Sequence, residues 1–327
     1  MSADTSGGGE PRLVGLPDVR AAAGRIEGRV VRTPLVPATW APGLWLKPEC
    51  LQPTGAFKLR GALNAVSRLA PERRAAGVVT HSSGNHAQAL ARAAREAGAT
   101  AVVVMPVGSP DVKVEATRRE GAEVVLVDVA ERLTTAERLA AERNLTLVPP
   151  FDDADVIAGQ GTVGLEVVED LPDVATVLVP VGGGGLASGV AAAVRALSPR
   201  TRVVGVEPEL AGEVAEGLRL GHRVQWTTER TGSTVADGVR TGPSELTWAH
   251  LEALVDDVVT VSEAAILEAM RLVVLQGRLV CEPSGAVAPA AVTSGLVDAR
   301  AGPVVAVVSG GNVDPDLLAA VVRGERS

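Results

Sequence analysis

Residues 176–186 read TVLVPVGGGGL, and this stretch decides the fold class. Its first half is rich in valine, as is typical of a parallel strand that is covered on both faces. This pattern predicts a strand at 176–182. Four consecutive glycines follow, and the alanine-rich residues after them predict a helix at 185–197. A buried strand that ends in glycine and leads directly into a helix is the repeating unit of an open α/β sheet.

The same alternation of valine-rich and alanine-rich segments recurs along most of the chain. Further strands are predicted at 77–82, 100–106, 123–128, 202–207 and 303–309, and further helices at 85–97, 111–120 and 130–144. Residues 149–153, PPFDD, are the clearest break in this pattern and mark a candidate crossing between domains. The predicted fold class is therefore α/β with parallel sheets, and ligands are expected beyond the carboxyl ends of the strands.

The glycines from Gly182 to Gly185 predict a binding site for an anion. Because glycine has no Cβ, consecutive backbone N–H groups can converge on an anion at the start of a helix. No GKS or GKT follows, and the segment lacks the GxGxxG pattern of dinucleotide sites, so a phosphate monoester fits best. The alternative is an ordinary flexible turn.

A second segment, QPTGAFKLRG at 52–61, places Lys58 at the start of a helix predicted to end near Leu69. The chain has 31 basic residues but only three lysines, the others being Lys47 and Lys113. A helix N-terminus disfavours a cation and so helps to lower the pKa of an amine, as a nucleophilic or Schiff-base lysine requires. The alternative is a solvated lysine at a helix start.

Two more segments supply polar groups at predicted strand ends. Residues 80–86, THSSGNH, combine hydroxyls and an amide with the N–H groups of a helix start, which suits a carboxylate or a ring oxygen. The alternative is helix capping by Ser83 or Asn85. Residues 308–312, VSGGN, end the last predicted strand with a hydroxyl, or form only a glycine-rich turn.

Composition excludes several function classes. The formal charge of −8 argues against broad nucleic-acid binding, and no apolar stretch reaches the ~18 residues that a membrane-spanning helix needs. Cys50 and Cys281 lack metal-ligand spacing. The first residues, MSADTSGGGEP, have neither a basic nor an apolar region, so we expect a disordered tail, no secretory signal and a cytoplasmic protein.

The four segments, in this order, resemble the threonine dehydratase and serine racemase family of pyridoxal-phosphate enzymes. The resemblance covers residues 13–322, nearly the whole chain. It implies the fold type II architecture, similar to the tryptophan synthase β-subunit, with two open-sheet α/β domains. The large cofactor-binding domain would comprise 1–70 plus 153–327, and the small domain 71–152. The resemblance also implies a homodimer.

The resemblance further assigns residues to the cofactor pyridoxal 5′-phosphate and to an amino-acid substrate. The implied cofactor-binding residues are Phe57, Lys58, Asn85, Gly182, Gly183, Gly184, Gly185 and Ser309. The implied substrate-binding residues are Ser82, Ser83, Gly84, Asn85 and His86. Lys58 matches the catalytic lysine that carries the cofactor and moves the α-proton, Asn85 would bond the 3′-oxygen, and Ser309 would face the pyridine nitrogen. Ser83 matches the second catalytic acid/base of the racemases.

The implied activity is a dehydratase (ammonia-lyase) that converts L-threonine or L-serine into 2-oxobutyrate or pyruvate and ammonia. Phe151 is similar to the threonine dehydratase version of its segment, where serine racemases carry Asn. A serine racemase and a 3-hydroxyaspartate dehydratase remain alternatives on the same fold, and Arg132 lies near a basic position of the racemases. A non-catalytic ligand-binding protein is the remaining alternative.

Some family members also bind Mg²⁺, Mn²⁺ or Ca²⁺ through oxygen ligands that follow a strand. By the resemblance, Glu207, Ala211 and Glu213 occupy those positions. Carboxylate and carbonyl oxygens suit such hard cations. The alternative is a pair of solvated surface glutamates.

Overall fold

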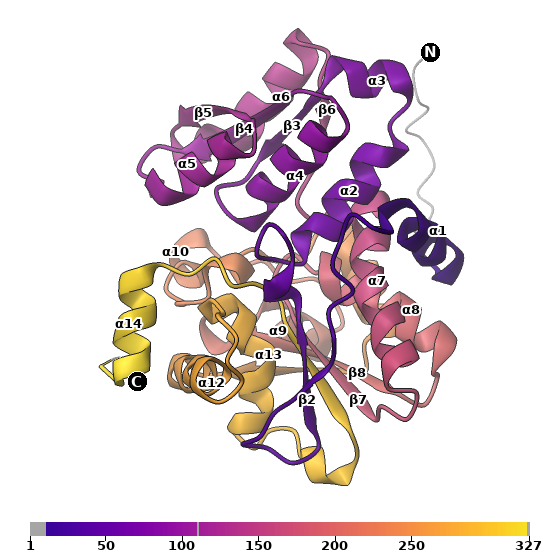
Figure 1. The fold of residues 1–327 in the computed structure, drawn as a ribbon, viewed down its shortest axis with the longest axis vertical. Coiled ribbons are helices and arrows are strands. Elements are labelled where there is room, and N and C mark those ends of the chain that lie inside the picture. Colours follow the sequence, from indigo (N-terminus) through magenta and orange to yellow (C-terminus); the bar gives the residue numbers. More distant parts are fainter. Residues whose placement is uncertain (1–10, 110, 326–327) are drawn as a thin grey trace.

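The computed structural model describes residues 11–109 and 111–325 as two lobes, each built around one sheet (Figure 1). The tail predicted at the start of the chain lies, apart from Pro11, outside the described residues. No helix in the described ranges is both long enough and apolar enough to cross a membrane.

The smaller lobe contains a parallel four-stranded sheet in the order β5-β4-β3-β6. Its strands are β3 (Val78–His81), β4 (Ala101–Pro106), β5 (Glu123–Val127) and β6 (Thr146–Leu147), and its helices are α3 (Pro71–Ala76), α4 (Asn85–Glu96), α5 (Asp111–Arg119) and α6 (Arg132–Glu142). Helices α4 and α5 cover one face and α6 the other (Figure 1). Along β4, Val103 packs toward α4 whereas Val102 and Val104 pack toward α6. A strand that is covered on both faces needs apolar residues at every position, and this explains the three consecutive valines of β4.

The larger lobe contains a six-stranded sheet in the order β1-β2-β10-β7-β8-β9, parallel except for β1. Its strands are β1 (Val36–Pro37), β2 (Leu44–Pro48), β7 (Thr176–Pro180), β8 (Arg202–Pro208), β9 (Asp257–Val261) and β10 (Val304–Val308). Strand β10 lies between β2 and β7, so the last strand of the chain joins an early strand to a central one.

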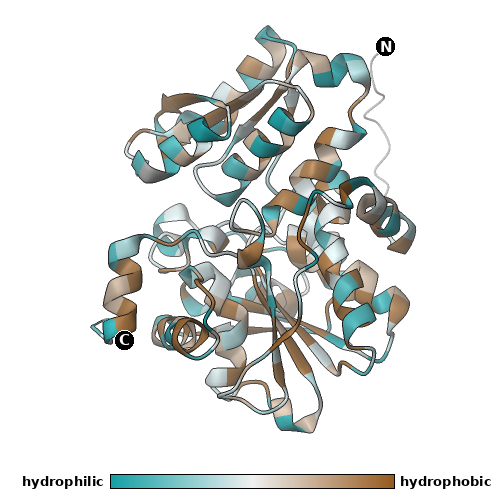
Figure 2. Cartoon of the chain, viewed as in Figure 1, coloured by the Kyte–Doolittle hydropathy of each residue, from teal (hydrophilic) through white to brown (hydrophobic). Residues whose placement is uncertain are grey.

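The remaining helices lie outside 71–152; some pack directly on the faces of this larger sheet, and others pack on neighbouring helices. They are α1 (Leu16–Ile26), α2 (Lys58–Arg68), α7 (Ala154–Asp170), α8 (Gly185–Leu197), α9 (Glu213–Leu220), α10 (Thr228–Thr231), α11 (Glu245–Leu254), α12 (Glu263–Leu275), α13 (Pro283–Thr293) and α14 (Pro315–Arg323). Short 3-10 helices span Glu49–Leu51, Val129–Glu131, Glu209–Ala211, Asp237–Val239 and Ala299–Ala301. Alternate residues of β10 join the cores on opposite faces, Val305 with α8 and Ala306 with α13. The strands are mostly hydrophobic, whereas the helices around them alternate between hydrophobic and hydrophilic residues (Figure 2).

The predicted fold class is confirmed, and every predicted strand and helix exists within two residues of its expected ends. Helix α6 begins at Arg132 because the residues before it form a 3-10 turn. The four-stranded sheet lies inside 71–152 and the six-stranded sheet outside it. The domain boundaries themselves remain predictions.

A buried cluster of charges joins α2, β2 and α7. The fully buried guanidinium of Arg60 donates to Glu49 at 2.7 Å and to Glu166 at 2.6 Å, and Lys47 also donates to Glu166 at 2.6 Å. Burial alone would raise the pKa of Glu49, but the charge and hydrogen bonds of Arg60 outweigh it and lower that pKa. The cluster gives Lys47 a structural role.

Close packing of α7 against α8 predicts opposite effects for two helical glycine substitutions. A Cβ on Gly189 of α8 would overlap the Ile157 carbonyl and the backbone of Gly161, whereas a Cβ on Gly24 of α1 would contact none of the described residues. We therefore expect Gly189→Ala to destabilise the protein by about 1–3 kcal/mol through overpacking. Gly24→Ala should stabilise it by about 0.5–1 kcal/mol through helix propensity. Urea unfolding midpoints measure both, and a Gly189→Ala protein as stable as the wild type would contradict the packing.

Candidate active site

A cavity of about 310 Å³ lies where the carboxyl ends of strands from both lobes meet. Every residue of the predicted cofactor and substrate sets lines it: Phe57, Lys58, Ser82, Ser83, Gly84, Asn85, His86, Gly182, Gly183, Gly184, Gly185 and Ser309. The predicted metal set does not line this cavity. The structure therefore brings four segments, far apart in sequence, to one place, as the strand-end rule requires.

Lys58 is the first residue of α2, and its amine faces the cavity. Its Nζ donates to the carbonyl oxygen of Pro150 at 2.7 Å and lies 5.1 Å from the centre of the Phe57 ring. No carboxylate among the described residues forms an ion pair with it, in contrast to Lys47 and Lys113. Burial lowers the pKa of Lys58 to about 8. This amine is therefore available as a nucleophile near neutral pH.

The glycine segment forms the N-terminus of α8. None of the four glycine N–H groups donates to an acceptor within the described part of the chain. Gly184 has a φ of 84°, which favours glycine, and a Cβ on Gly183 would overlap the ring of Phe151. Unsatisfied N–H groups at the positive end of a helix dipole suit a phosphate group.

The 82–86 segment leads into α4, which begins at Asn85. Gly84 precedes the helix, and no side chain in the described part of the chain caps it, so the alternative that Ser83 or Asn85 only caps the helix is wrong. Ser82 Oγ accepts a long bond of 3.4 Å from Gly84 N. The half-buried Ser83 hydroxyl and the first N–H groups of α4 therefore remain available for a ligand in the cavity.

The His86 side chain is neutral, and a backbone carbonyl fixes its position. Its Nε2 lies 3.1 Å from the Val148 carbonyl, and the side chain is 2% exposed. Burial, and then the nearby charge of Lys58, lowers the pKa of His86 to about 3. The side chain therefore has a structural bond, and a substrate carboxylate would reach this residue through its backbone N–H.

Ser309 connects the lysine segment to the last strand. Its side chain is 4% exposed, its Oγ donates to the Ser284 carbonyl at 3.2 Å, and its own carbonyl accepts from Phe57 N at 3.0 Å. A neutral hydroxyl at this position cannot form an ion pair with a ring nitrogen, and it can donate only one hydrogen bond.

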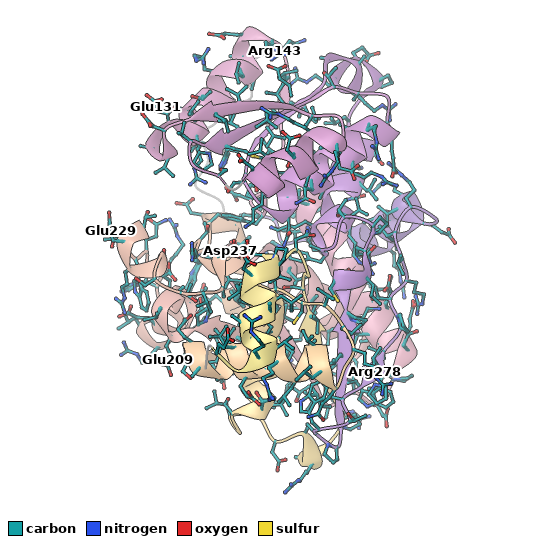
Figure 3. The ribbon with its side chains drawn as sticks, turned by 60° about the vertical axis from the view of Figure 1, so that its left-hand side comes forward. Glu131, Arg143, Glu209, Glu229, Asp237 and Arg278 are labelled. Carbon is teal, nitrogen blue, oxygen red and sulfur yellow. The ribbon has the colours of Figure 1, made fainter. Side chains whose placement is uncertain are left out.

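Several residues of the cavity were not predicted from the sequence. The buried carboxyl of Glu282 lines the cavity. Burial raises the pKa of this carboxyl to about 8, and the nearby charge of Asp237 adds to the effect. Lys113 of α5 forms an ion pair of 2.7 Å with Asp237, which lies on the side of the larger lobe that faces the smaller one (Figure 3). Arg132 of α6, which by the resemblance lies near a basic position of the racemases, also lines the cavity. The scarcity of lysine was a signal for Lys113, but no spacing pattern pointed to Glu282.

These groups fit pyridoxal phosphate. The Lys58 amine can form an imine, the N–H groups of the glycine segment can bind the phosphate, and the buried Ser309 hydroxyl lines the same cavity. Residues 26–310 match the family model described as "Pyridoxal-phosphate dependent enzyme". The chain belongs to this family. Its cofactor is accordingly pyridoxal phosphate, and the protein is an enzyme.

Relatives with two different activities are similar to this enzyme. The catabolic L-threonine dehydratase of Staphylococcus aureus is 38% identical over 323 residues, covering 95% of this chain and 92% of the relative. The structure of maize serine racemase superposes with a TM-score of 0.90 at 36% identity, covering 96% and 98% of the two chains. The structure of a serine racemase from Dictyostelium discoideum gives a TM-score of 0.86 at 37% identity, covering 92% and 99%. A solved threonine deaminase also gives 0.86, at 44% identity and with the same coverage.

The predicted metal residues lie together at the end of β8 and the start of α9. Glu207 is 1% and Glu213 3% exposed, so the alternative of solvated surface glutamates is wrong. Glu207 accepts hydrogen bonds from Val214 N at 3.0 Å and Ala215 N at 2.8 Å, which caps α9. No cluster of three or more His, Cys, Asp or Glu suited to a metal occurs in the described ranges, so a cation here would also need carbonyl or water ligands.

The lowered pKa of Lys58 predicts how the enzyme reacts with its cofactor. Only the neutral amine is nucleophilic, so the rate at which cofactor-free enzyme binds pyridoxal phosphate covalently should rise with pH and level off above about 8. Stopped-flow absorbance measures this rate, and Lys58→Arg, whose guanidinium stays protonated, should not react. A rate that is independent of pH through this range would contradict the assignment.

Proposed function

We propose that this enzyme is an ammonia-lyase that converts L-threonine and L-serine into 2-oxobutyrate and pyruvate, with release of ammonia. The observation that carries the proposal is the Lys58 amine, which has no carboxylate partner among the described residues and shares a cavity with the unsatisfied N–H groups of Gly182 to Gly185. The similarity to threonine dehydratases supports the choice of reaction.

Bound pyridoxal phosphate would supply an electron sink for the charge that develops at the substrate α-carbon. In this proposal Lys58 Nζ removes the α-proton, and burial keeps enough of this amine neutral to act as a base. The N-terminus of α4, with Ser83, binds the substrate carboxylate. The N-terminus of α8 holds the phosphate, and the smaller lobe limits the access of water.

A second candidate function is serine racemisation, favoured by one observation. Ser83 lines the cavity together with Lys58, and a racemase needs an acid/base on each face of the α-carbon. The similarity to maize serine racemase is comparable with that to the dehydratases. A 3-hydroxyaspartate dehydratase is a further variant, for which Lys113 and Arg132 offer positive charge at the cavity. Membership of an enzyme family sets aside the non-catalytic alternative.

The reaction is tested by measuring 2-oxo acid and ammonia from L-threonine, L-serine and 3-hydroxyaspartate, with chiral analysis of the remaining serine. We expect 2-oxobutyrate and pyruvate from the first two and little D-serine. Ser83→Ala should reduce any racemisation about a hundredfold, the usual contribution of one acid/base, and should lower elimination by less, because the N–H groups of α4 still bind the substrate carboxylate. D-Serine as the main product would replace the dehydratase by a racemase, and turnover of 3-hydroxyaspartate alone would change the substrate class.

The proposal extends to a divalent cation, a homodimer and a cytoplasmic location. Glu207 and Glu213 would hold Mg²⁺, Mn²⁺ or Ca²⁺ together with the Ala211 carbonyl. A buried carboxylate with no cationic hydrogen-bond partner in the described residues is suited to such an ion.

Cation binding predicts a gain in stability that depends on Glu207. A ligand at a hundred times its dissociation constant stabilises the folded state by about 2.7 kcal/mol, so Mg²⁺ or Ca²⁺ should raise the thermal unfolding midpoint. Glu207→Gln should abolish this rise, whereas Glu209→Gln, at an exposed neighbour (Figure 3), should preserve it. An equal rise in both variants would contradict the site.

A further inference from the structure

The side chain of Asn85 is hydrogen-bonded at both ends. Its Oδ1 accepts from Asn312 Nδ2 at 2.8 Å, and its Nδ2 donates to Glu282 Oε1 at 2.6 Å. The three residues come from the start of α4, the segment after β10 and the segment before α13. We refer to Asn312, Asn85 and Glu282 as the amide relay. It joins the smaller lobe to two segments of the larger lobe at the cavity.

A backbone carbonyl fixes the direction of the relay. Asn312 Nδ2 also donates to the carbonyl oxygen of Thr54 at 2.8 Å, and a carbonyl can only accept. The atom of Asn312 that faces Thr54 must therefore be its NH₂ group. The same NH₂ group meets Asn85, so the atom of Asn85 facing it must be the oxygen. The NH₂ group of Asn85 is consequently directed toward Glu282, an acceptor.

One hydrogen of the Asn85 NH₂ group remains without an acceptor in the described residues. An NH₂ group carries two hydrogens, and Glu282 takes only one. Asn85 is partly buried and lines the cavity. The second hydrogen is therefore available to a ligand in the cavity, and the bonds to Asn312 and Glu282 limit the directions in which it can point.

Gly310 makes room for Glu282 at the end of the relay. Glu282 is 5% exposed, and its backbone N–H donates to the Gly310 carbonyl at 3.1 Å. A Cβ on Gly310 would overlap Glu282 Oε1, the atom that accepts from Asn85. The SGGN segment thus supports the relay at both ends. Asn312 donates a hydrogen bond to Asn85, and Gly310, which has no Cβ, leaves room for Glu282.

We propose that Asn312 and Glu282 are positioning residues that hold the Asn85 amide with one N–H directed at the ring oxygen of the cofactor. The inference rests on the proposed function and on the contact, implied by the family resemblance, between Asn85 and that oxygen, the 3′-oxygen. A fixed neutral donor favours the deprotonated oxygen over the protonated one, because the negatively charged oxygen accepts a stronger, charge-assisted hydrogen bond. The relay would therefore set the balance between the visible and near-ultraviolet absorbance bands of the lysine-bound cofactor.

The sharpest test is Asn312→Asp, which keeps the shape of the side chain and reverses its polarity. A carboxylate accepts only, so it should turn the Asn85 amide around and direct its oxygen toward Glu282 and the cavity. In the cofactor-bound enzyme we expect the visible band to fall relative to the near-ultraviolet band. The cofactor dissociation constant, measured by fluorescence, should rise roughly tenfold, the effect of one lost hydrogen bond.

Two variants of Glu282 test the other end of the relay. Glu282→Gln retains an acceptor oxygen and should keep the wild-type spectrum, whereas Glu282→Met removes the acceptor and should shift the bands as Asn312→Asp does. Asn64→Asp is the matched control, because Asn64 is a buried asparagine outside the cavity that also donates to a backbone carbonyl, that of Asp155. It should leave the spectrum unchanged even if it lowers stability.

A double-mutant comparison separates the relay from the contact on which it rests. Asn85→Ala alone should shift the bands, and adding Asn312→Asp to it should cause no further shift. If Asn85→Ala shifts the bands and both Asn312→Asp and Asn312→Ala do not, the relay is wrong although the Asn85 contact stands. If Asn85→Ala has no effect, both are wrong. Because the readout is absorbance, a failure of the proposed elimination reaction leaves this test unaffected.

Discussion

The buried ion pairs of Arg60 hold the helix that begins with Lys58, and the site depends on that helix. Arg60 bonds Glu49 next to β2 and Glu166 in α7, so three elements meet through one guanidinium. Removing one partner of such a cluster leaves a buried unpaired charge, which costs several kcal/mol. Two residues away, Lys58 has only a backbone carbonyl as partner among the described residues. The buried cations Lys47 and Arg60 are thus neutralised by glutamates, whereas the Lys58 amine has no carboxylate partner in the described residues.

The sequence predicted the fold class and the central strands of each sheet because these signals are local. A strand covered on both faces must be apolar throughout, and β3, β4, β7 and β10 therefore appear as valine runs. The glycine segment was also interpreted from local chemistry, because residues without a Cβ let consecutive N–H groups converge at a helix start. Strands β1, β2, β6 and β9 were not predicted. β1 and β6 have two residues each, β2 contains a lysine, and β9 is a half-buried strand at the edge of its sheet.

The site was predicted as a set of segments but not as a network. Lys58, Ser309 and the 82–86 loop each follow from local chemistry at a strand end or helix start. Glu282 and Asn312 act through a partner that is distant in sequence, and the direction of the Asn85 amide depends on the Thr54 carbonyl. The structural bond of the His86 side chain likewise depends on Val148, which only the fold brings near. Tertiary hydrogen bonds of this kind have no periodic signature.

The insertion of β10 between β2 and β7 has a consequence for how the protein is made. Until residues near 304 leave the ribosome, β2 and β7 each have an unpaired edge, and such edges invite association with other chains. Phe57 N finds its acceptor, the Ser309 carbonyl, only when the last strand is in place. Contacts this distant in sequence fold slowly. The cofactor pocket is therefore completed only after β10 has been synthesised, and nascent chains that lack β10 would expose two strand edges to association with other chains.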